Sequence, residues 1–183
     1  MVAFAEGDSD AFAALYDRYT RPLINFFYKM CYDRGVAEDL TQETFLRLVK
    51  YAARYRPEAS FKTYLYTIAR NLMIDRHRSR KSAPKTVSTE VRVHEDGATL
   101  GSTIEGREVD TVKQLADREA ADIVRTVLQQ LPEAQRSVFV LAEAQGLKYR
   151  EISEILGVPV GTVKSRMNAA VGTLRGLLGR VLQ

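Results

Sequence analysis

Hydroxyl, amide and cationic side chains are concentrated near the C-terminus, in the stretch YREISEILGVPVGTVKSRMNAA at 149–170. With helical spacing, Val163 and Met167 share an apolar face, so the polar members must occupy the open side and flanks. These polar members are Thr162, Lys164, Ser165, Arg166 and Asn168. Hydroxyl groups and a helix N-terminus can reach phosphates, while Lys, Arg and Asn can pair with base edges in a major groove. The stretch therefore favours binding to duplex DNA, against the alternative of a helical hairpin with a solvated polar face.

The turn before that helix has the composition of a helix-turn-helix motif. Ile152, Ile155 and Leu156 form the apolar face of a short preceding helix. Gly157 can adopt a positive φ at the end of that helix, and Pro159 suits the start of the next because it has no N–H to leave unpaired. The arrangement predicts two helices joined by a tight turn.

A second group of candidate binding residues interleaves aromatic rings with cations. Before an expected helix lie Tyr51, Arg54, Tyr55 and Arg56, and at its end lie Arg76, His77, Arg78, Arg80 and Lys81. Within it, Phe61, Leu65, Ile68 and Leu72 form the expected buried stripe, with Tyr64, Tyr66, Arg70, Asn71 and Asp75 off its centre. Unpaired nucleic acid suits this mixture, because bases stack on rings and phosphates attract cations. The alternative is that the tyrosines pack in the core and the cations favour a helix C-terminus.

A third candidate surface lies on the helix expected from Val36 to Tyr55. One half of this helix carries Leu40, Thr41, Thr44, Phe45, Leu48, Val49 and Ala52. The other half carries Asp39, Gln42, Glu43, Leu46, Arg47 and Lys50. An apolar Leu46 amid charges is typical of a protein-docking surface with a small hydrophobic centre, although a solvated face also tolerates one leucine.

The elements that position these groups are all expected to be helices. A first helix should be capped by Asp8 or Ser9 and should break or kink at Pro22 before it resumes from Leu23 to Tyr32. The remaining helices are expected at Val36–Tyr55, Phe61–Arg80, Asp117–Leu131, Pro132–Gln145, Tyr149–Leu156 and Val160–Leu178. No segment alternates as a β-strand does, so we predict an all-α fold.

The distribution of charge divides the chain into three parts. Lys and Arg number 14 against 10 Asp and Glu in residues 1–81, 4 against 7 in 82–117, and 9 against 6 in 118–183. The middle part has no sustained apolar period and carries Ser, Thr, Gly and Pro84. We therefore expect two small helical domains, 1–81 and 118–183, joined by a flexible acidic linker, with the helix-turn-helix in the second domain.

The composition argues against several classes of protein. The chain has 183 residues and a net charge of +4, which favours an anionic partner only weakly. Cys31 is the single cysteine, and His77 and His94 are the only histidines, so we expect no disulfide, metal site, cofactor or catalytic residue. No stretch approaches the roughly 18–20 apolar residues that cross a bilayer, and the N-terminus does not resemble a signal peptide. A cytoplasmic protein that is not an enzyme is the expectation.

Four stretches of the sequence carry a family resemblance. They are GDSDAFAALYDRY (7–19), AEDLTQETFLRLVKY (37–51), SFKTYLYTIARNLMIDRHRSR (60–80) and LPEAQRSVFVLAEAQGLKYREISEILGVPVGTVKSR (131–166). In that order they resemble the extracytoplasmic-function (ECF) group of bacterial RNA polymerase sigma factors over nearly the whole chain. The resemblance implies an N-terminal domain that docks on core polymerase and opens the minus-ten element, and a C-terminal domain that reads the minus-thirty-five element. It also implies three kinds of partner: the clamp helices and flap of core RNA polymerase, promoter DNA, and an anti-sigma factor.

The resemblance implies a role for three sets of residues. The set expected to grip the clamp helices is Asp39, Gln42, Glu43 and Leu46. The loop 55–60 resembles one that pockets a flipped minus-ten base, and the full minus-ten set is Tyr55, Arg56, Ser60, Lys62, Tyr64, Arg70, Asn71, Asp75 and Arg78. The minus-thirty-five set is Tyr149, Pro159, Gly161, Thr162, Lys164, Ser165, Arg166 and Asn168.

The chain departs from the family pattern at three positions. Tyr64 stands where the family usually has Trp, and a ring there should suffice for packing. Ala169 and Val171 stand where the family often has arginines, which should weaken the minus-thirty-five contact and its salt dependence. A different class of function, a regulator that binds duplex operators through 149–170 without polymerase, remains the alternative.

Overall fold

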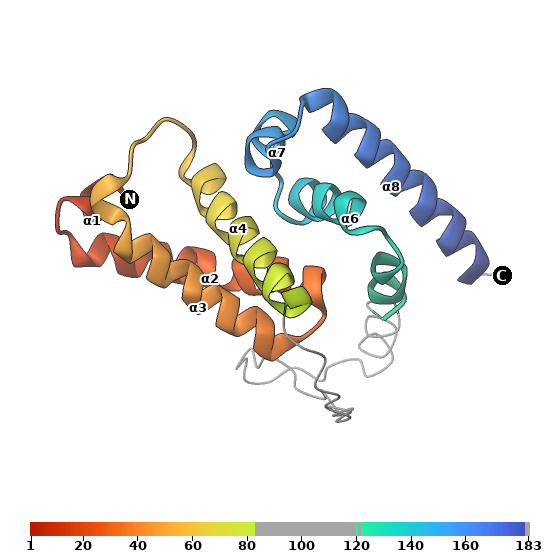
Figure 1. Cartoon of the computed structure of the whole chain (residues 1–183), viewed down its shortest axis with the longest axis horizontal. Helices are drawn as coiled ribbons and strands as arrows, with labels where there is room; N and C mark the ends of the chain where they lie inside the picture. Colours follow the sequence, from red (N-terminus) through yellow and green to blue (C-terminus); the bar gives the residue numbers. More distant parts are fainter. Residues whose placement is uncertain (83–119, 121, 182–183) are drawn as a thin grey trace, which may run out of the picture.

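The computed structural model describes residues 1–82, 120 and 122–181. Its N-terminal domain contains α1 (Val2–Ala5), α2 (Ser9–Cys31), α3 (Arg34–Lys50), the 3-10 helix η1 (Ala52–Arg54) and α4 (Phe61–Ser82). Its C-terminal domain contains a helix at 122–129, then α6 (Glu133–Phe139), the π-helix η2 (Val140–Ala144), α7 (Tyr149–Leu156) and α8 (Val160–Val181). The described ranges contain helices and turns without a strand, which confirms the all-α prediction (Figure 1). The expected linker lies outside the described residues, apart from Ser82, as do His94 and the side chains of Arg80 and Lys81.

Helix α2 begins as predicted but is not broken at Pro22. The Asp8 carboxylate accepts hydrogen bonds from the backbone N–H groups of Asp10 at 2.9 Å and Ala11 at 3.1 Å, which makes it the N-cap. The helix runs through Pro22 to Cys31 without interruption. Proline removes one backbone hydrogen bond, but Leu23, which follows it, and Phe27 on the next turn are fully buried, and their packing favours a continuous helix.

Helix α3 is shorter than predicted, and Val49 does not belong to its buried half as expected. The helix ends at Lys50 and a 3-10 turn follows, instead of continuing to Tyr55. The buried half contains Leu40, Thr41, Thr44, Phe45, Leu48 and Ala52, as expected. Val49, by contrast, is 46% exposed. At about 100° per residue Val49 lies at the border of the buried half, about 60° from the exposed Leu46.

The two buried threonines of α3 are compatible with the core because their hydroxyl groups bond to the helix itself. Thr41 donates to the carbonyl oxygen of Ala37 at 2.8 Å, and Thr44 donates to that of Leu40 at 2.7 Å. Such bonds satisfy the polar atom without a partner on another element. The apolar face of α3 can therefore pack closely on α2 and α4.

The helix-turn-helix follows the sequence prediction closely. Helix α7 covers the predicted Tyr149–Leu156, and Ile152, Ile155 and Leu156 are buried. Gly157 has φ +63° at the helix C-terminus, and its N–H donates to the carbonyl oxygen of Glu154 at 3.3 Å. The next helix begins after Pro159, whose carbonyl oxygen accepts from Thr162 and Val163. The expected helix from Pro132 to Gln145 instead changes from α to π geometry at Val140.

Replacing Gly157 by Ala should destabilise the fold without any steric clash. A Cβ at this position meets nothing within 4 Å, so only the cost of a left-handed backbone remains. We expect a loss of about 1 kcal/mol in the free energy of unfolding, measured by urea denaturation. Gly172→Ala is the matched control, because Gly172 is helical and equally open. That variant should gain about 0.5–1 kcal/mol, and equal effects of the two changes would contradict the explanation.

Candidate nucleic-acid and partner interfaces

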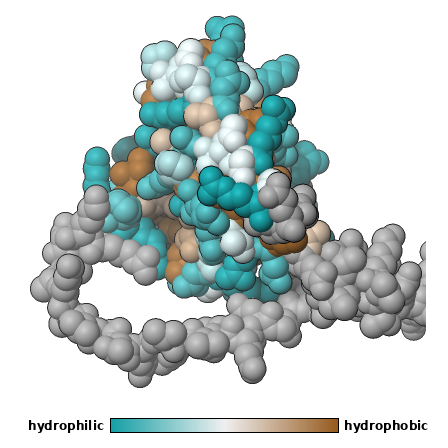
Figure 2. All heavy atoms as spheres, turned by 90° about the vertical axis from the view of Figure 1, so that its right-hand side faces the viewer, coloured by the Kyte–Doolittle hydropathy of each residue, from teal (hydrophilic) through white to brown (hydrophobic). Residues whose placement is uncertain are grey.

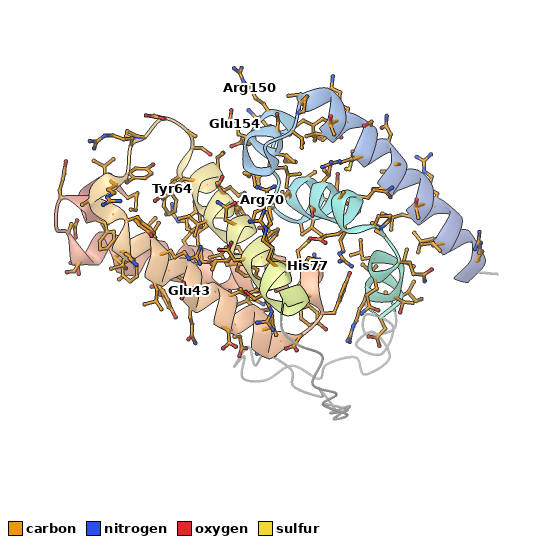
Figure 3. All side chains as sticks on the ribbon, viewed as in Figure 1. Glu43, Tyr64, Arg70, His77, Arg150 and Glu154 are labelled. Atoms are coloured by element: carbon orange, nitrogen blue, oxygen red, sulfur yellow. The ribbon has the colours of Figure 1, made fainter. Side chains whose placement is uncertain are left out.

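The first candidate surface is the outer face of α3, here called the docking face and defined as Asp39, Gln42, Glu43 and Leu46. Asp39 and Gln42 are exposed, Glu43 is half-buried, and Leu46 is 64% exposed. Glu43 lies on α3 away from the C-terminal domain (Figure 3), and its carboxylate accepts a bond from Arg47 at 3.1 Å. Together with the exposed Val49, Leu46 forms an apolar area beside carboxylates, a combination suited to a protein partner.

The second surface begins with an aromatic loop. Tyr55 lies edge-on to Tyr64, with ring centroids 5.0 Å apart, and more distantly to Phe61 at 6.5 Å. Arg56 and Ser60 in the same loop are exposed. Burial, and next the nearby Tyr55, raise the pKa of Tyr64, so its hydroxyl stays protonated near neutral pH. The loop thus places half-buried rings next to an exposed cation.

Tyr66 does not belong to this surface, although its spacing places it off the expected buried stripe. It is fully buried, and its ring packs edge-on to Phe26 with centroids 5.2 Å apart. The stripe on α4 that is buried consists of Leu65, Tyr66, Ala69 and Leu72, while Phe61 and Ile68 are only partly buried. For Tyr66 the alternative of packing in the core is therefore correct, because Phe26 of α2 and Gln145 of the C-terminal domain both contact it.

The later residues of α4 point in two directions. Asn71, Asp75 and Arg78 are exposed. Asp75 accepts bonds from the guanidinium of Arg47 at 3.3 Å, which ties α4 to α3. Arg70 instead turns to the C-terminal domain and donates to the carbonyl oxygen of Leu156 at 3.2 Å. The expected minus-ten residues therefore do not form one continuous surface.

Several contacts between the domains involve Gln145 and Glu151, two C-terminal residues that the sequence analysis did not single out. Lys62 donates to the backbone carbonyl oxygen of Gln145, and the Tyr66 hydroxyl donates to the side-chain oxygen of the same residue. Ser60 donates to the carboxylate of Glu151 at 3.0 Å. The partners lie 79 to 91 residues apart in the sequence, so no local pattern could indicate them.

Glu151 has a role within its own domain as well. Its carboxylate accepts from the backbone N–H of Lys148 at 2.9 Å and so caps the start of α7. This backbone bond is the main cause of a lowered pKa, with further contributions from the Ser60 and Thr63 hydroxyl groups, while partial burial opposes it. The side chain is therefore ionised at neutral pH and favours the positive end of the helix dipole.

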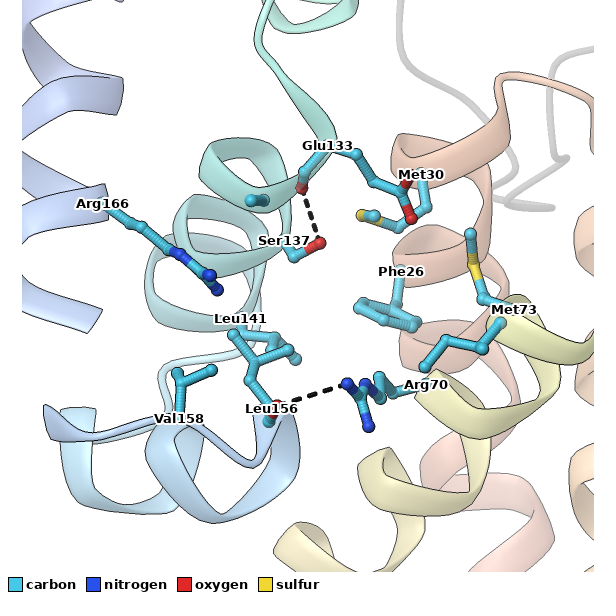
Figure 4. A pocket seen from close by; sticks show the side chains of 12 residues that line it. Phe26, Met30, Arg70, Met73, Glu133, Ser137, Leu141, Leu156, Val158 and Arg166 are labelled. Carbon is cyan, nitrogen blue, oxygen red and sulfur yellow. Dashed lines mark hydrogen bonds between the residues drawn. The ribbon is translucent and has the colours of Figure 1, made fainter. Parts of the chain in front are cut away.

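The third surface is the open side of α8. Val163, Met167 and Ala170 are buried as predicted, which leaves the polar residues outside. Pro159, Gly161, Lys164, Ser165 and Asn168 are exposed, and Tyr149, Thr162 and Arg166 are half-buried. Arg166 lines a cleft between the domains, opposite Arg70 (Figure 4). The face of the molecule on the right of Figure 1, where α8 lies, is mainly hydrophilic with small separate apolar areas (Figure 2).

Comparison with known proteins decides between a sigma factor and another DNA-binding regulator. The family model for sigma-70 region 2 matches residues 15–83, and the model for sigma-70 region 4 matches residues 121–174. The ECF RNA polymerase sigma factor SigW of Bacillus subtilis is 34% identical over 93% of this chain and 90% of its own length. The chain belongs to the ECF group of RNA polymerase sigma factors. CarQ of Myxococcus xanthus, an RNA polymerase sigma factor, is 30% identical over 99% of this chain and 97% of its own.

Solved structures show the same fold. The sigma factor RpoE of Bartonella quintana, in complex with the anti-sigma factor NepR, has a TM-score of 0.67 and 24% identity, with 92% of this chain and 97% of that chain covered. CnrH, in complex with the cytosolic domain of CnrY, has a TM-score of 0.69 and 23% identity, with 96% and 92% covered. At these identities the likeness concerns the fold alone.

The family assigns the activity of this sigma factor: it directs RNA polymerase to promoters. The docking face and the aromatic loop lie within the match to region 2, and the helix-turn-helix lies within the match to region 4. None of the helices described is long and apolar enough to span a membrane. At two positions where the family often has arginines, this chain has the apolar residues Ala169 and Val171, so α8 carries no cation there. Ala169 is exposed and Val171 is half-buried.

Asp75→Asn should leave the stability of the sigma factor nearly unchanged, although it breaks the ion pair that joins α3 to α4. The side chains of Arg47 and Asp75 are 33% and 55% exposed, and exposed pairs contribute about 0–1 kcal/mol. Urea unfolding should therefore show a change below about 1 kcal/mol. Glu38→Gln, which breaks the exposed pair with Arg34, is the control and should behave alike. A much larger loss for Asp75→Asn alone would show that the α3–α4 pair is structurally important.

Proposed function

We propose that this sigma factor divides its work between two units. The N-terminal domain docks on the clamp helices of core polymerase through the docking face and holds the melted minus-ten strand. The C-terminal domain places α8 in the duplex at the minus-thirty-five element, beside the polymerase flap. The observation that carries the proposal is an exposed Leu46 among carboxylates on one domain and an exposed polar face on the helix-turn-helix of the other. The protein acts by binding in the cytoplasm and catalyses no reaction of its own.

Docking through α3 is supported by its mixture of charge and apolar area. Asp39 and Glu43 supply negative charge that steers a basic partner, and burial of the exposed Leu46 adds apolar contact at the centre. Hydrophobic centres of this kind contribute most of the affinity in protein interfaces, whereas rim charges mainly set the rate and specificity of association.

Holding of the minus-ten strand is supported by the aromatic loop and the exposed polar residues of α4. A flipped base needs a preformed apolar pocket beside cations, because unstacking costs a few kcal/mol. Tyr55 and Tyr64 supply rings, Arg56 and Arg78 supply charge, and Asn71 and Asp75 supply hydrogen-bonding groups to the strand. Lys62, Arg70 and Ser60 complete the set once their contacts with the C-terminal domain are released.

An anti-sigma factor is the proposed inhibitor. RpoE of Bartonella quintana was solved with the anti-sigma factor NepR, which supports a partner of the same kind for this chain. The exposed Leu46 and Val49 offer the inhibitor the apolar area that core polymerase would otherwise cover. Binding of one would then exclude binding of the other.

Reversing the charge of the docking face should abolish binding to polymerase. We expect the double variant Asp39→Arg with Glu43→Arg to bind purified core polymerase about 100-fold more weakly or worse, because like charges across an interface cost several kcal/mol. Affinity would be measured by fluorescence anisotropy, and helical content by circular dichroism. The control is Glu6→Arg with Asp17→Arg, which makes the same change in net charge at exposed positions on another part of the domain. Undiminished affinity of the first variant would remove the docking assignment.

Removing two cations from α8 should weaken recognition of the upstream element. In Lys164→Ala with Arg166→Ala, run-off transcription should depend less on the minus-thirty-five sequence. If both side chains contact phosphates, the slope of log affinity against log salt should also fall by about 1.8. Arg175→Ala with Arg180→Ala removes the same charge from exposed positions further along α8. Equal promoter preference in the two variants would argue against Lys164 and Arg166 as DNA contacts.

A further inference from the structure

Three cations line a small cavity where α2, α4 and η2 meet. Its volume is about 360 Å³, within the range of about 300–1,000 Å³ in which ligand pockets commonly fall. Arg18 and Lys29 come from α2, and Lys62 comes from α4. No carboxylate of a described residue lines the cavity, so its charged groups are all positive.

The spacing of residues on α2 explains how one helix supplies most of the wall. Arg18, Pro22, Asn25 and Lys29 all line the cavity. At about 100° per residue these four positions lie within about 60° of one another, so they form one stripe. Phe27, about 180° from Arg18, is fully buried in the core. The stripe therefore faces away from the core of the N-terminal domain and toward η2.

The two cations of the stripe have no anionic partner. Within the ranges that the structure describes, neither Arg18 nor Lys29 forms an ion pair or a side-chain hydrogen bond. Glu143 lies beside Lys29 at a neighbouring, smaller cavity, but the two are not paired. Like charges gathered at one place repel one another, and a bound anion would turn that repulsion into attraction.

Several hydrogen-bond donors in the wall are also available. The ammonium group of Lys62 donates to the backbone carbonyl oxygen of Gln145, which uses one of its three protons. Two protons remain for a ligand. Tyr19 and Asn25 add a hydroxyl group and an amide to the wall. The Tyr19 ring is held in place by Phe61, with centroids 5.2 Å apart.

We propose that this cavity binds a small molecule through a polyphosphate group. Arg18, Lys29 and Lys62 neutralise the phosphates, and Asn25 donates a further hydrogen bond. Arginine suits this role because its planar guanidinium can bond to two phosphate oxygens at once, while lysine acts as a compact point charge. Arg18, Lys29 and Asn25 belong to none of the three sets of residues that serve promoter or polymerase, so the site adds to the proposed function and does not depend on it.

The distances along α2 favour several linked phosphates over one. Arg18 and Lys29 are separated by 11 positions, or about 16 Å of helix at 1.5 Å per residue. Lys62 approaches the cavity from α4, across from the stripe. Cations spread over such a length match a chain of phosphates that carries several charges, whereas a single phosphate ion would reach only some of them.

The shape of the cavity favours a short molecule over a nucleic-acid strand. Ala144 and Gln145 close it on the side of the C-terminal domain. A strand has to continue in both directions beyond each phosphate that it places, whereas a small polyphosphate ends within the site. The free polyphosphate and a nucleoside triphosphate share this chemistry, and they differ in the nucleoside that the second carries.

The first test is isothermal titration calorimetry of the full chain with tripolyphosphate, ATP and inorganic phosphate, at about 0.15 M salt without Mg²⁺. We expect tripolyphosphate to bind at one site, and inorganic phosphate to bind at least about 10-fold more weakly. Tighter binding of ATP than of tripolyphosphate would identify a nucleotide as the occupant, and weaker binding would identify the free polyphosphate. No binding of either at about 1 mM, or equal binding of inorganic phosphate, would overturn the proposal.

Two variants locate the binding in the cavity. Arg18→Gln with Lys29→Gln should weaken tripolyphosphate binding about 10- to 100-fold, because each removes a charged hydrogen-bond donor. Asn25→Phe leaves the net charge unchanged and should weaken binding at least as much, because the ring occupies the space of the ligand. Arg21→Gln with Lys50→Gln is the control, since it removes the same charge from exposed positions outside the cavity. Circular dichroism verifies that each protein is folded.

The control and a DNA titration decide against the two competing explanations. An equal loss in Arg21→Gln with Lys50→Gln would show attraction to the net positive charge of the protein, and would overturn the site. The affinity for a random single-stranded DNA oligomer is measured with the same proteins. A loss for DNA as large as the loss for tripolyphosphate in Arg18→Gln with Lys29→Gln would assign these cations to a strand instead of a small molecule. Neither titration contains polymerase, so failure of the site leaves the proposed function standing.

Discussion

The structure depends on helix α4, which is packed against both domains at once. Leu65, Ala69 and Leu72 bury one side of it in the N-terminal core, and Tyr66 and Arg70 contact the C-terminal domain. A helix covered on two sides can carry few free polar groups, so those beside the interface must find partners there. The hydrogen bonds to Gln145, Glu151 and Leu156 follow from that requirement.

Apolar side chains supply the packing between the domains. Phe26 and Tyr66 of the N-terminal domain belong to the same buried cluster as Leu141 and Leu156 of the C-terminal domain, so separation of the domains would expose apolar area to water. The hydrogen bonds beside this cluster satisfy polar groups that the packing covers, and they fix how the two domains meet.

The sequence predicted what local chemistry determines. Helix α7 and its turn were placed correctly because Gly157 and Pro159 allow few alternatives, and the outer face of α3 was recognised from Leu46 among charges. The continuity of α2 through Pro22 and the exposure of Val49 depend on packing at the neighbouring residues, which periodicity does not contain. The burial of Tyr66 depends on Phe26 of another helix and on Gln145, 79 positions away, and Lys62 bonds to the same glutamine from 83 positions away.

The same distinction decides what a substitution would affect. Residues whose role is local, such as the cap at Asp8 or the left-handed Gly157, stabilise a single helix or turn. Gln145 differs, because its buried side chain bonds to Tyr66 and Pro22 of the other domain. A substitution there acts on the contact between the domains, since it leaves a buried polar partner unpaired on the opposite side.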